Sequence, residues 1–371
     1  MNVPHSASIV SHERMDAFAY FSIFDILAKL GIAYLTYIAP IDKLIFYAFL
    51  QCLTTFLVFL IYWIYCRKNF VECRYSFIWD KSLMKQMFSF TGWNFIGSTS
   101  EVLKDQGGNM GINLFSGPAV NAARGIAMQV NHAVYSFVTN FTTALNPQIT
   151  KCYAVGDTDN MLKLVFRGAR FSFYILLILS VPILVNTEYI IQLWLGKNPE
   201  HTCNFIRLIL IYSLNEALAR PLSTANLATG KIRNYQLSVG IMQLINVPVS
   251  YVALKMGAPV EAVFITMIVI GIICVFLRAI NLRVYVRFPM KSFVTEVYVN
   301  IIIVFFLSMS LPYVAHFFLP ENIWGLILSC VVCVCTTIPA ILYVGCRRSE
   351  REAIVKAVLK KVPILKNRIS K

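Results

Sequence analysis

The chain has 371 residues, of which 58% are hydrophobic and only 14% charged, and its mean hydropathy is +0.66. Soluble domains carry about 25% charged residues, so this composition excludes an ordinary soluble protein. The formal net charge of +15 does not indicate nucleic-acid binding, because the basic residues lie in short runs between apolar segments without an RNA- or DNA-binding motif.

Apolar segments of transmembrane length recur along the whole chain. A helix needs about 20 apolar residues to cross a ~30 Å hydrocarbon core, and ten stretches have this length. They lie near residues 18–39, 44–66, 86–106, 119–147, 166–187, 203–226, 235–256, 260–280, 293–315 and 324–346. The sequence therefore predicts an all-α, polytopic integral membrane protein with about ten transmembrane helices.

Basic residues are distributed unevenly between the loops that join these spans. If the N-terminus lies in the cytoplasm, most of the 33 Lys and Arg residues fall on the inner side. They include a cluster at and after the inner end of the eighth span: Arg278, Arg283, Arg287 and Lys291. This bias predicts that both termini are cytoplasmic. The longest outer loop, Asn186–His201, is too short for an external catalytic domain, which favours a protein that is not an enzyme.

The third and fourth spans are too polar on one side to face lipid. On a helical wheel of the fourth span, the polar residues fall within an arc of about 100°, opposite an arc of Ala, Val, Phe and Leu. The polar residues are Asn121, Arg124, Asn131, His132, Tyr135, Thr139, Thr142 and Asn146. The third span has a similar stripe: Thr91, Asn94, Ser98, Glu101 and Asp105. A charge at the bilayer centre costs about 2.5–3.5 kcal/mol, so these faces predict a hydrophilic cavity inside the membrane.

Charged pairs inside two spans have two interpretations. Asp25 with Lys29, and Glu216 with Arg220, are each four residues apart, so each pair can neutralise itself on one helix face. The alternative is a functional role. It is favoured for the second pair, because Pro221 follows at once and predicts a bent or broken helix beside a cavity.

Two residues of the fourth span and the C-terminal tail allow further predictions. Arg124 has no acidic residue within one turn, so it must meet one on another helix or bind an anionic ligand. His132 fits either an interhelical hydrogen bond or a proton relay. The stretch after Arg347 is basic with apolar residues at helical spacing, which predicts a helix lying on anionic lipid headgroups.

The ten cysteines show no spacing typical of a metal site. Most lie within predicted spans, and Cys333 and Cys335 point to different faces of one helix. We interpret them as small apolar packing residues and predict neither a metal nor a cofactor.

Three stretches resemble bacterial polysaccharide flippases. They are GPAVNAARGIAMQVNHAVYSFVTNFTTALNPQITKCYAVGD, from Gly117 to Asp157, then ATGKIRNYQ after the sixth span, and the opening NVPHSASIVSHERM. These flippases share a superfamily with multidrug (MATE-type) exporters and lipid II flippases. The resemblance implies a MATE-like fold: two six-helix lobes related by a pseudo-twofold axis around a central cavity, with two extra helices at the C-terminus.

The resemblance also implies a division of the chain. Residues 1–84 would be a remnant of the first lobe with two helices, and roughly the first four helices of the family would be lacking. The complete second lobe would span residues 85–287, the two extra helices 288–346, and a basic cytoplasmic tail 347–371.

The function implied by the resemblance is a flippase of the bacterial cytoplasmic (inner) membrane. Its substrate would be a lipid-linked oligosaccharide on undecaprenyl diphosphate, moved outward for O-antigen, lipopolysaccharide or exopolysaccharide assembly. Further partners would be membrane lipids and other polysaccharide-assembly proteins. The chain has no Walker-type GxxxxGK[ST] motif and so no ATPase site of its own, which favours coupling to an ion gradient.

Candidate site residues follow from this function. A cation should hold the diphosphate, with Arg124 the first choice and Lys104 and Arg220 the second. Amides and a phenol should line the sugar path: Asn94, Asn109, Asn113, Asn121, Gln129, Asn131 and Tyr135. The candidates for ion coupling are Glu101, Asp105, His132 and Glu216.

Other functions remain open. A multidrug cation antiporter of the same superfamily would favour an acidic or aromatic cavity over Arg124 and abundant amides. A membrane polysaccharide polymerase or ligase would need a larger external loop. An inert truncated fragment is a further alternative.

Overall fold

The computed structural model describes residues 3–12, 14–38, 42–73, 79–316, 318–320 and 322–361. Every regular element in these ranges is helical, and the chain divides into two compact units, Met1–Lys85 (the N-terminal unit) and Gln86–Lys371 (the C-terminal unit). The helices are α1 (Val3–Ser11), α2 (Met15–Ile38), α3 (Lys43–Asn69), η1 (Val71–Cys73), α4 (Lys81–Ala154), α5 (Thr158–Val185), α6 (Thr187–Leu195), α7 (Thr202–Ala228), α8 (Arg233–Lys255), α9 (Ala262–Tyr285), α10 (Met290–Phe293), η2 (Val294–Val299), α11 (Asn300–His316), α12 (Ile323–Ala340), η3 (Ile341–Gly345) and α13 (Arg348–Lys361).

Within the described residues, seven helices are long and apolar enough to cross a membrane. They are Met15–Ile38, Lys43–Asn69, Thr158–Val185, Arg233–Lys255, Ala262–Tyr285, Met290–His316 and Ile323–Gly345. Each coincides with a predicted span, which confirms the prediction of an all-α, polytopic membrane protein. The other three predicted spans lie on α4 and α7, whose polar residues keep them outside this set.

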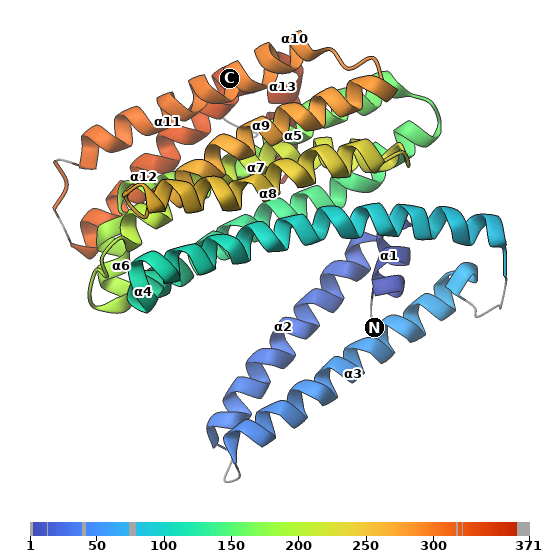
Figure 1. Cartoon of the computed structure of the whole chain (residues 1–371), viewed down its shortest axis with the longest axis horizontal. Helices are drawn as coiled ribbons and strands as arrows, with labels where there is room; N and C mark the ends of the chain where they lie inside the picture. The colour runs from blue at the N-terminus through green and yellow to red at the C-terminus, as the bar shows by residue number, and fades with distance from the viewer. Residues whose placement is uncertain are drawn as a thin grey trace. The chain divides into compact units, whose positions relative to one another are not determined.

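The long element α4 consists of two helices joined at one glycine. Gly117 has φ 80° and ψ 178°, and the helical ranges beside it are 81–116 and 118–154. The Nη2 of Arg124 donates a hydrogen bond of 3.0 Å to the carbonyl oxygen of Asp105. A straight helix would separate residues 19 positions apart by about 28 Å, so the chain turns back near Gly117 (Figure 1). Glycine adopts this φ without strain, which explains why the turn needs no loop.

The second of these helices, 118–154, buries a face that straddles its polar and apolar arcs. The buried residues recur every three or four positions: Ala123, Arg124, Ala127, Asn131, Val134, Val138, Thr142 and Ile149. Of the predicted polar face, Arg124 and Thr142 are therefore buried, whereas His132 and Thr139 are exposed. The wheel locates a polar face but does not say which part of it neighbouring helices cover.

In the C-terminal unit, α7 is the central helix. It packs against α5 and α9, and α9 packs in turn against α8 (Figure 1). The helices α11 and α12 pack against each other and against α5. Side chains between these helices, such as Leu176, Ala217 and Val275, are fully buried. The arrangement leaves polar side chains of α4, α7, α8 and α9 facing one another.

A buried charge cluster holds the C-terminal helix α13 against α5. Glu350 is 6% exposed, accepts a hydrogen bond of 2.7 Å from Nη2 of Arg170, and lies 3.0 Å from Nε of Arg167. Nη1 of Arg170 and the hydroxyl of Tyr174 both donate to the carbonyl oxygen of Gly345. These bonds tie the end of η3 and the start of α13 to the middle of the bundle.

The basic tail predicted after Arg347 begins as the helix α13. The last part of that prediction, residues 362–371, lies outside the described residues. Contact of the tail with lipid headgroups stays a prediction.

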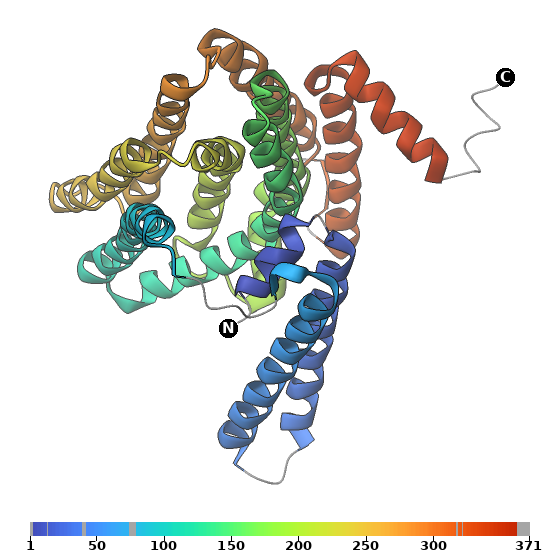
Figure 2. The same ribbon diagram turned by 90° about the vertical axis from the view of Figure 1, so that its right-hand side faces the viewer.

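The N-terminal unit is a hairpin of α2 and α3, with α1 contacting both (Figure 2). The side chain of Asp42 caps α3 by accepting from the backbone N–H of Leu44. Lys29 donates to Asp25 at 2.7 Å, so this pair neutralises itself on one helix face. The unit has a small core, in which Cys66 and Ile9 are fully buried.

The two units, Met1–Lys85 and Gln86–Lys371, do not test the predicted division into domains. The C-terminal unit contains the ranges predicted as second lobe, extra helices and tail. The assignment of these ranges to lobes of a MATE-like fold stays a prediction.

Candidate functional site

A polar cavity of about 210 Å³ lies among α4, α7, α8 and α9 of the C-terminal unit. Its wall carries ten polar or charged side chains: Asn94, Ser98, Glu101, Glu216, Arg220, Ser223, Tyr235, Gln236, Gln243 and Arg278. Four separate segments contribute them, so the cavity exists only once the bundle has assembled.

Two glycines let α4 and α8 approach closely at this cavity. A Cβ atom at Gly97 would lie 1.9 Å from Oε1 of Gln236, and one at Gly240 would lie 3.0 Å from Oγ of Ser100. Gln236 uses the space over Gly97 and donates through Nε2 to Oδ1 of Asn94 at 2.8 Å. The missing side chains therefore allow an amide-to-amide bond in the cavity wall.

Glu216 and Arg278 form an ion pair across the cavity wall. Nη1 of Arg278 lies 3.5 Å from Oε1 of Glu216, and the two side chains are 6% and 17% exposed. Nε and Nη1 of Arg278 make no hydrogen bond to any residue that the structure describes. An interior cation with unused donors is costly unless water or a ligand completes its bonding. This pair is therefore a candidate for ligand contact.

Arg220 is the second cation in the wall. Its Nε donates to the hydroxyl of Tyr135 at 3.1 Å, and its guanidinium carbon lies 5.5 Å from the centre of the Tyr135 ring. Arg220 and Glu216 thus bind different partners, and the self-neutralising interpretation of this pair does not describe the folded chain. A guanidinium has five N–H donors, and Arg220 spends one of them on Tyr135.

Glu101 adds a carboxylate from the first helix of α4. Its side chain lines the cavity and is exposed, and it forms no ion pair with any residue in the described ranges. The wall therefore carries two acids and two arginines. Among the described residues, only Glu216 and Arg278 of these four form an ion pair.

The two other predicted cations lie outside the cavity wall. Arg124 is 9% exposed and bonds the carbonyl oxygen of Asp105. Lys104 is 4% exposed, donates to the hydroxyl of Tyr212 at 2.8 Å, and lies 3.4 Å from Oδ1 of Asp105. Protein groups hold both in the packed interior, so of the three predicted cations only Arg220 reaches the cavity.

Of the predicted sugar-path residues, Asn94 lines the cavity. Tyr135 lies behind the wall and accepts a hydrogen bond from Arg220, which lines the cavity. Asn131 is buried and accepts a hydrogen bond of 2.6 Å from Ser213, which joins α4 to α7. The remaining four occupy half-buried or exposed positions on α4 away from the cavity: Asn109, Asn113, Asn121 and Gln129.

Among the predicted ion-coupling residues, Glu101 and Glu216 line the cavity. Asp105 pairs with Lys104, and His132 is exposed. The helix α7 runs through Pro221 to Ala228 as one element, so the chain is not broken at this proline, and a bend there stays a prediction.

Five polar or charged residues of the wall carry no cavity prediction from the sequence: Ser223, Tyr235, Gln236, Gln243 and Arg278. Charge counting assigns Arg278 to the inner loop after the eighth span, but α9 continues to Tyr285 and Arg278 is 5% exposed within it. A signal for the glutamines exists, because a spacing of seven residues places Gln236 and Gln243 on one face of α8.

The comparisons with known proteins give one family match. Residues 109–252 match the family model described as MatE, and this segment contains Glu216, Arg220 and both glutamines of the wall. No curated protein and no solved structure matches the chain. The fold is that of a polytopic membrane protein, and the match shows that residues 109–252 are similar to the MatE family of membrane exporters.

Proposed function

We propose that the protein is a flippase that moves lipid-linked oligosaccharide repeat units across the bacterial cytoplasmic membrane. The direction is from the inner to the outer leaflet, for assembly of a surface polysaccharide or lipopolysaccharide. The observation that supports this proposal best is the polar cavity of the C-terminal unit, in which two arginines stand among amides and hydroxyls.

The chemistry of the wall suits the two polar parts of such a substrate. Asn94, Gln236 and Gln243 offer donors and acceptors that can replace the hydration of sugar hydroxyls. A planar guanidinium presents paired N–H groups to phosphate oxygens, and among the described residues Arg220 donates through its side chain only to Tyr135. Arg220 therefore takes the diphosphate-binding role first assigned to Arg124, which is held by Asp105.

The size of the cavity limits what it holds at one time. Sites for drug-sized ligands measure about 300–1,000 Å³, and this cavity measures about 210 Å³. It accommodates a phosphate group or a single sugar ring rather than a whole repeat unit. Passage of a longer head would then proceed by successive contacts as the conformation alternates.

The test is complementation of a strain that lacks its own flippase, with surface polysaccharide as the readout and protein abundance measured beside it. Hydrogen bonds to charged groups contribute about 1.5–3 kcal/mol, so Arg220→Ala should reduce transport about 10- to 100-fold. Arg220→Lys should retain part of the activity, because it keeps the charge and loses the paired donors.

A matched control lies on the same helix. Arg207 is also a partly exposed arginine of α7 but pairs with Glu188 and does not line the cavity. Arg207→Ala should leave transport unchanged. Normal polysaccharide from Arg220→Ala, at normal abundance, would remove the cavity from the proposed pathway.

One observation favours a second candidate, a multidrug cation antiporter. Glu101 is an exposed carboxylate of the wall without an ion-pair partner among the described residues, and such a group attracts cations. In that function Glu101→Gln should abolish efflux of a cationic dye from cells, whereas Arg220→Gln should preserve it. If the protein is a flippase, Arg220→Gln should reduce surface polysaccharide more than Glu101→Gln does.

A further inference from the structure

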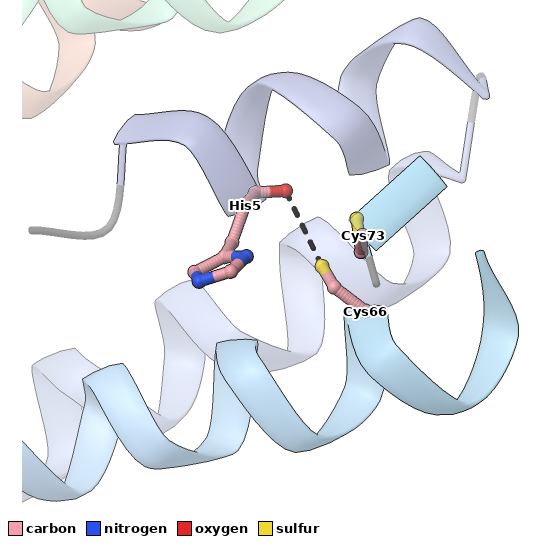
Figure 3. A group of neighbouring side chains, drawn as sticks. All are labelled: His5, Cys66 and Cys73. Atoms are coloured by element: carbon pink, nitrogen blue, oxygen red, sulfur yellow. Dashed lines mark hydrogen bonds between the residues drawn. The ribbon is translucent and has the colours of Figure 1, made fainter. Parts of the chain in front are cut away.

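The N-terminal unit contains a cluster of three metal-binding side chains. His5, Cys66 and Cys73 each direct one ligand atom into a common space, and these atoms lie within 4.8 Å of one another (Figure 3). The residues come from α1, from the last turn of α3 and from η1. The three residues lie on separate elements and have no regular spacing in the sequence, so the sequence pattern does not reveal this cluster.

The fold of the α3 end brings the two thiols together. The helix ends at Asn69, and the backbone N–H of Phe70 closes its last turn on the carbonyl oxygen of Cys66 at 2.9 Å. The short turn of η1 then returns Cys73 toward Cys66. Cys66 is fully buried and donates its S–H to the carbonyl oxygen of His5 at 3.4 Å, which fixes α1 over the pair (Figure 3).

The imidazole of His5 is available for coordination. Its ring packs at 5.9 Å from the ring of Phe59, and its nitrogens make no hydrogen bond within the described part of the chain. Neighbouring His12, by contrast, is engaged by Glu72 and stacked on Phe70. Of the two histidines at this end of the unit, only His5 makes no ring hydrogen bond to a described residue.

We propose that His5, Cys66 and Cys73 bind one Zn²⁺ ion. Thiolate and imidazole are ligands for zinc, whereas Mg²⁺ and Ca²⁺ require oxygen. In a tetrahedral site with Zn–S bonds of about 2.3 Å, the two sulfurs lie about 3.8 Å apart. The two sulfurs now lie within 4.8 Å of one another, so they need to approach by at most about 1 Å. Binding replaces two S–H protons with two Zn–S bonds, releases both protons, and leaves a neutral unit of Zn²⁺ and two thiolates.

The burial pattern agrees with an ion that enters from solvent. Cys66 is buried, whereas His5 and Cys73 are partly exposed, so water can complete the fourth position. The role we assign to the ion is structural. The core of this unit is small, and a metal that joins α1, α3 and η1 would stabilise contacts that few apolar residues support.

The experiment is zinc binding by the full chain in detergent, after removal of metal with a chelator. Metal analysis after Zn²⁺ loading should find one ion per chain, and loading should raise the midpoint of thermal unfolding. Cys66→Ser, Cys73→Ser and His5→Ala should each lose the bound ion and the thermal shift. The control Cys52→Ser, an exposed thiol of the same helix α3, should keep both.

Two further measurements guard against a variant that simply misfolds. Co²⁺ loading of the unmodified chain should give thiolate-to-cobalt charge-transfer absorption, which needs no mutation. Cys73→His should retain binding, because imidazole replaces one thiolate. Unchanged zinc stoichiometry in Cys66→Ser, absence of the cobalt band, or a Cys66–Cys73 disulfide in chain alkylated at cell lysis would each overturn the proposal.

Discussion

Two charge clusters of the C-terminal unit differ in how fully their hydrogen-bonding groups are used. In the α5–α13 cluster (Arg167, Arg170 and Glu350), the carboxylate meets both arginines and also accepts from the backbone N–H of Arg347 at 2.9 Å. In the cavity cluster (Glu216, Arg220 and Arg278), the described residues form one ion pair, and it is 3.5 Å long. Two nitrogens of Arg278 have no hydrogen bond to a described residue, against one, Nε of Arg170, in the α5–α13 cluster.

The difference separates a structural role from a binding role. Glu350 is enclosed by its own protein partners, so nothing is left for a ligand, and removing it strands a buried cation. The cavity cluster adjoins open volume, where water or substrate can supply the missing bonds. Burial of charge alone does not identify a site, whereas unused donors beside a cavity do.

The largest expected effect comes from removal of Glu350. Glu350→Ala leaves Arg170, 4% exposed, without its carboxylate and should lower the free energy of unfolding by about 3–5 kcal/mol. Thermal unfolding in detergent and membrane abundance are the measurements. The matched variant Glu352→Ala, an exposed acid of the same helix, should cost almost nothing. Equal stability of the two variants would show that the α5–α13 cluster does not have the structural role assigned to it.

A smaller loss of stability is expected in the cavity cluster. Glu216→Gln also deprives a buried arginine of its charge partner, but water in the cavity can solvate Arg278, so the cost should be about 1–3 kcal/mol. Transport should nevertheless fall strongly. Glu350→Gln is measured in parallel. If both variants lose the same free energy of unfolding, water does not solvate the cavity cluster better than the α5–α13 cluster.

The glycine turn of α4 gives a third test, because it joins the helix that carries Glu101 of the cavity wall to the helix that carries Arg124. Gly117→Ala puts a side chain at φ 80° and should cost about 1–2 kcal/mol. Gly125→Ala is the matched change in the following helix, where a Cβ meets open space, and it should be neutral or slightly stabilising. The ratio of transport to abundance should fall for the first variant alone.

The smallest effect is expected at an ion pair outside the membrane-spanning segments. Burial of Glu261 disfavours its charge, but a contact of 2.7 Å with Nδ1 of His201 and a hydrogen bond from Asn204 outweigh this, and the pKa of Glu261 falls below its usual 4.5. A carboxylate with a lowered folded-state pKa stabilises the chain above pH 4.5, and that increment is lost as the pH falls through the folded value.

The corresponding measurement is the unfolding midpoint as a function of pH. Relative to the unmodified chain, Glu261→Gln should lose less than about 1 kcal/mol at neutral pH, and the difference should shrink below pH 4.5. The Glu261–His201 pair thus indicates how much free energy of unfolding a partly exposed charge contact contributes. A gap between the two proteins that stays constant with pH would show that the carboxylate charge is not responsible.

The sequence alone determined the class of the protein and the positions of its apolar helices. Hydropathy over 20 residues is a local property, so spans such as Met15–Ile38 and Ala262–Tyr285 are legible without knowledge of any contact. The polar faces of α4 were identified from their periodicity, and Asn94 and Glu101 were chosen from them. Glu216 and Arg220 of α7 were chosen as a charged pair four residues apart beside Pro221. All four were chosen before their common cavity was known.

The tertiary structure decided which charged residues meet. A helical wheel gives the direction of a side chain but not the helix that covers it, so Arg124 looked unpaired until the turn at Gly117 placed it against Asp105. Arg278 looked like a loop residue until α9 carried it inside, opposite Glu216. Burial and pairing are properties of contacts between distant segments, and only the folded chain contains them.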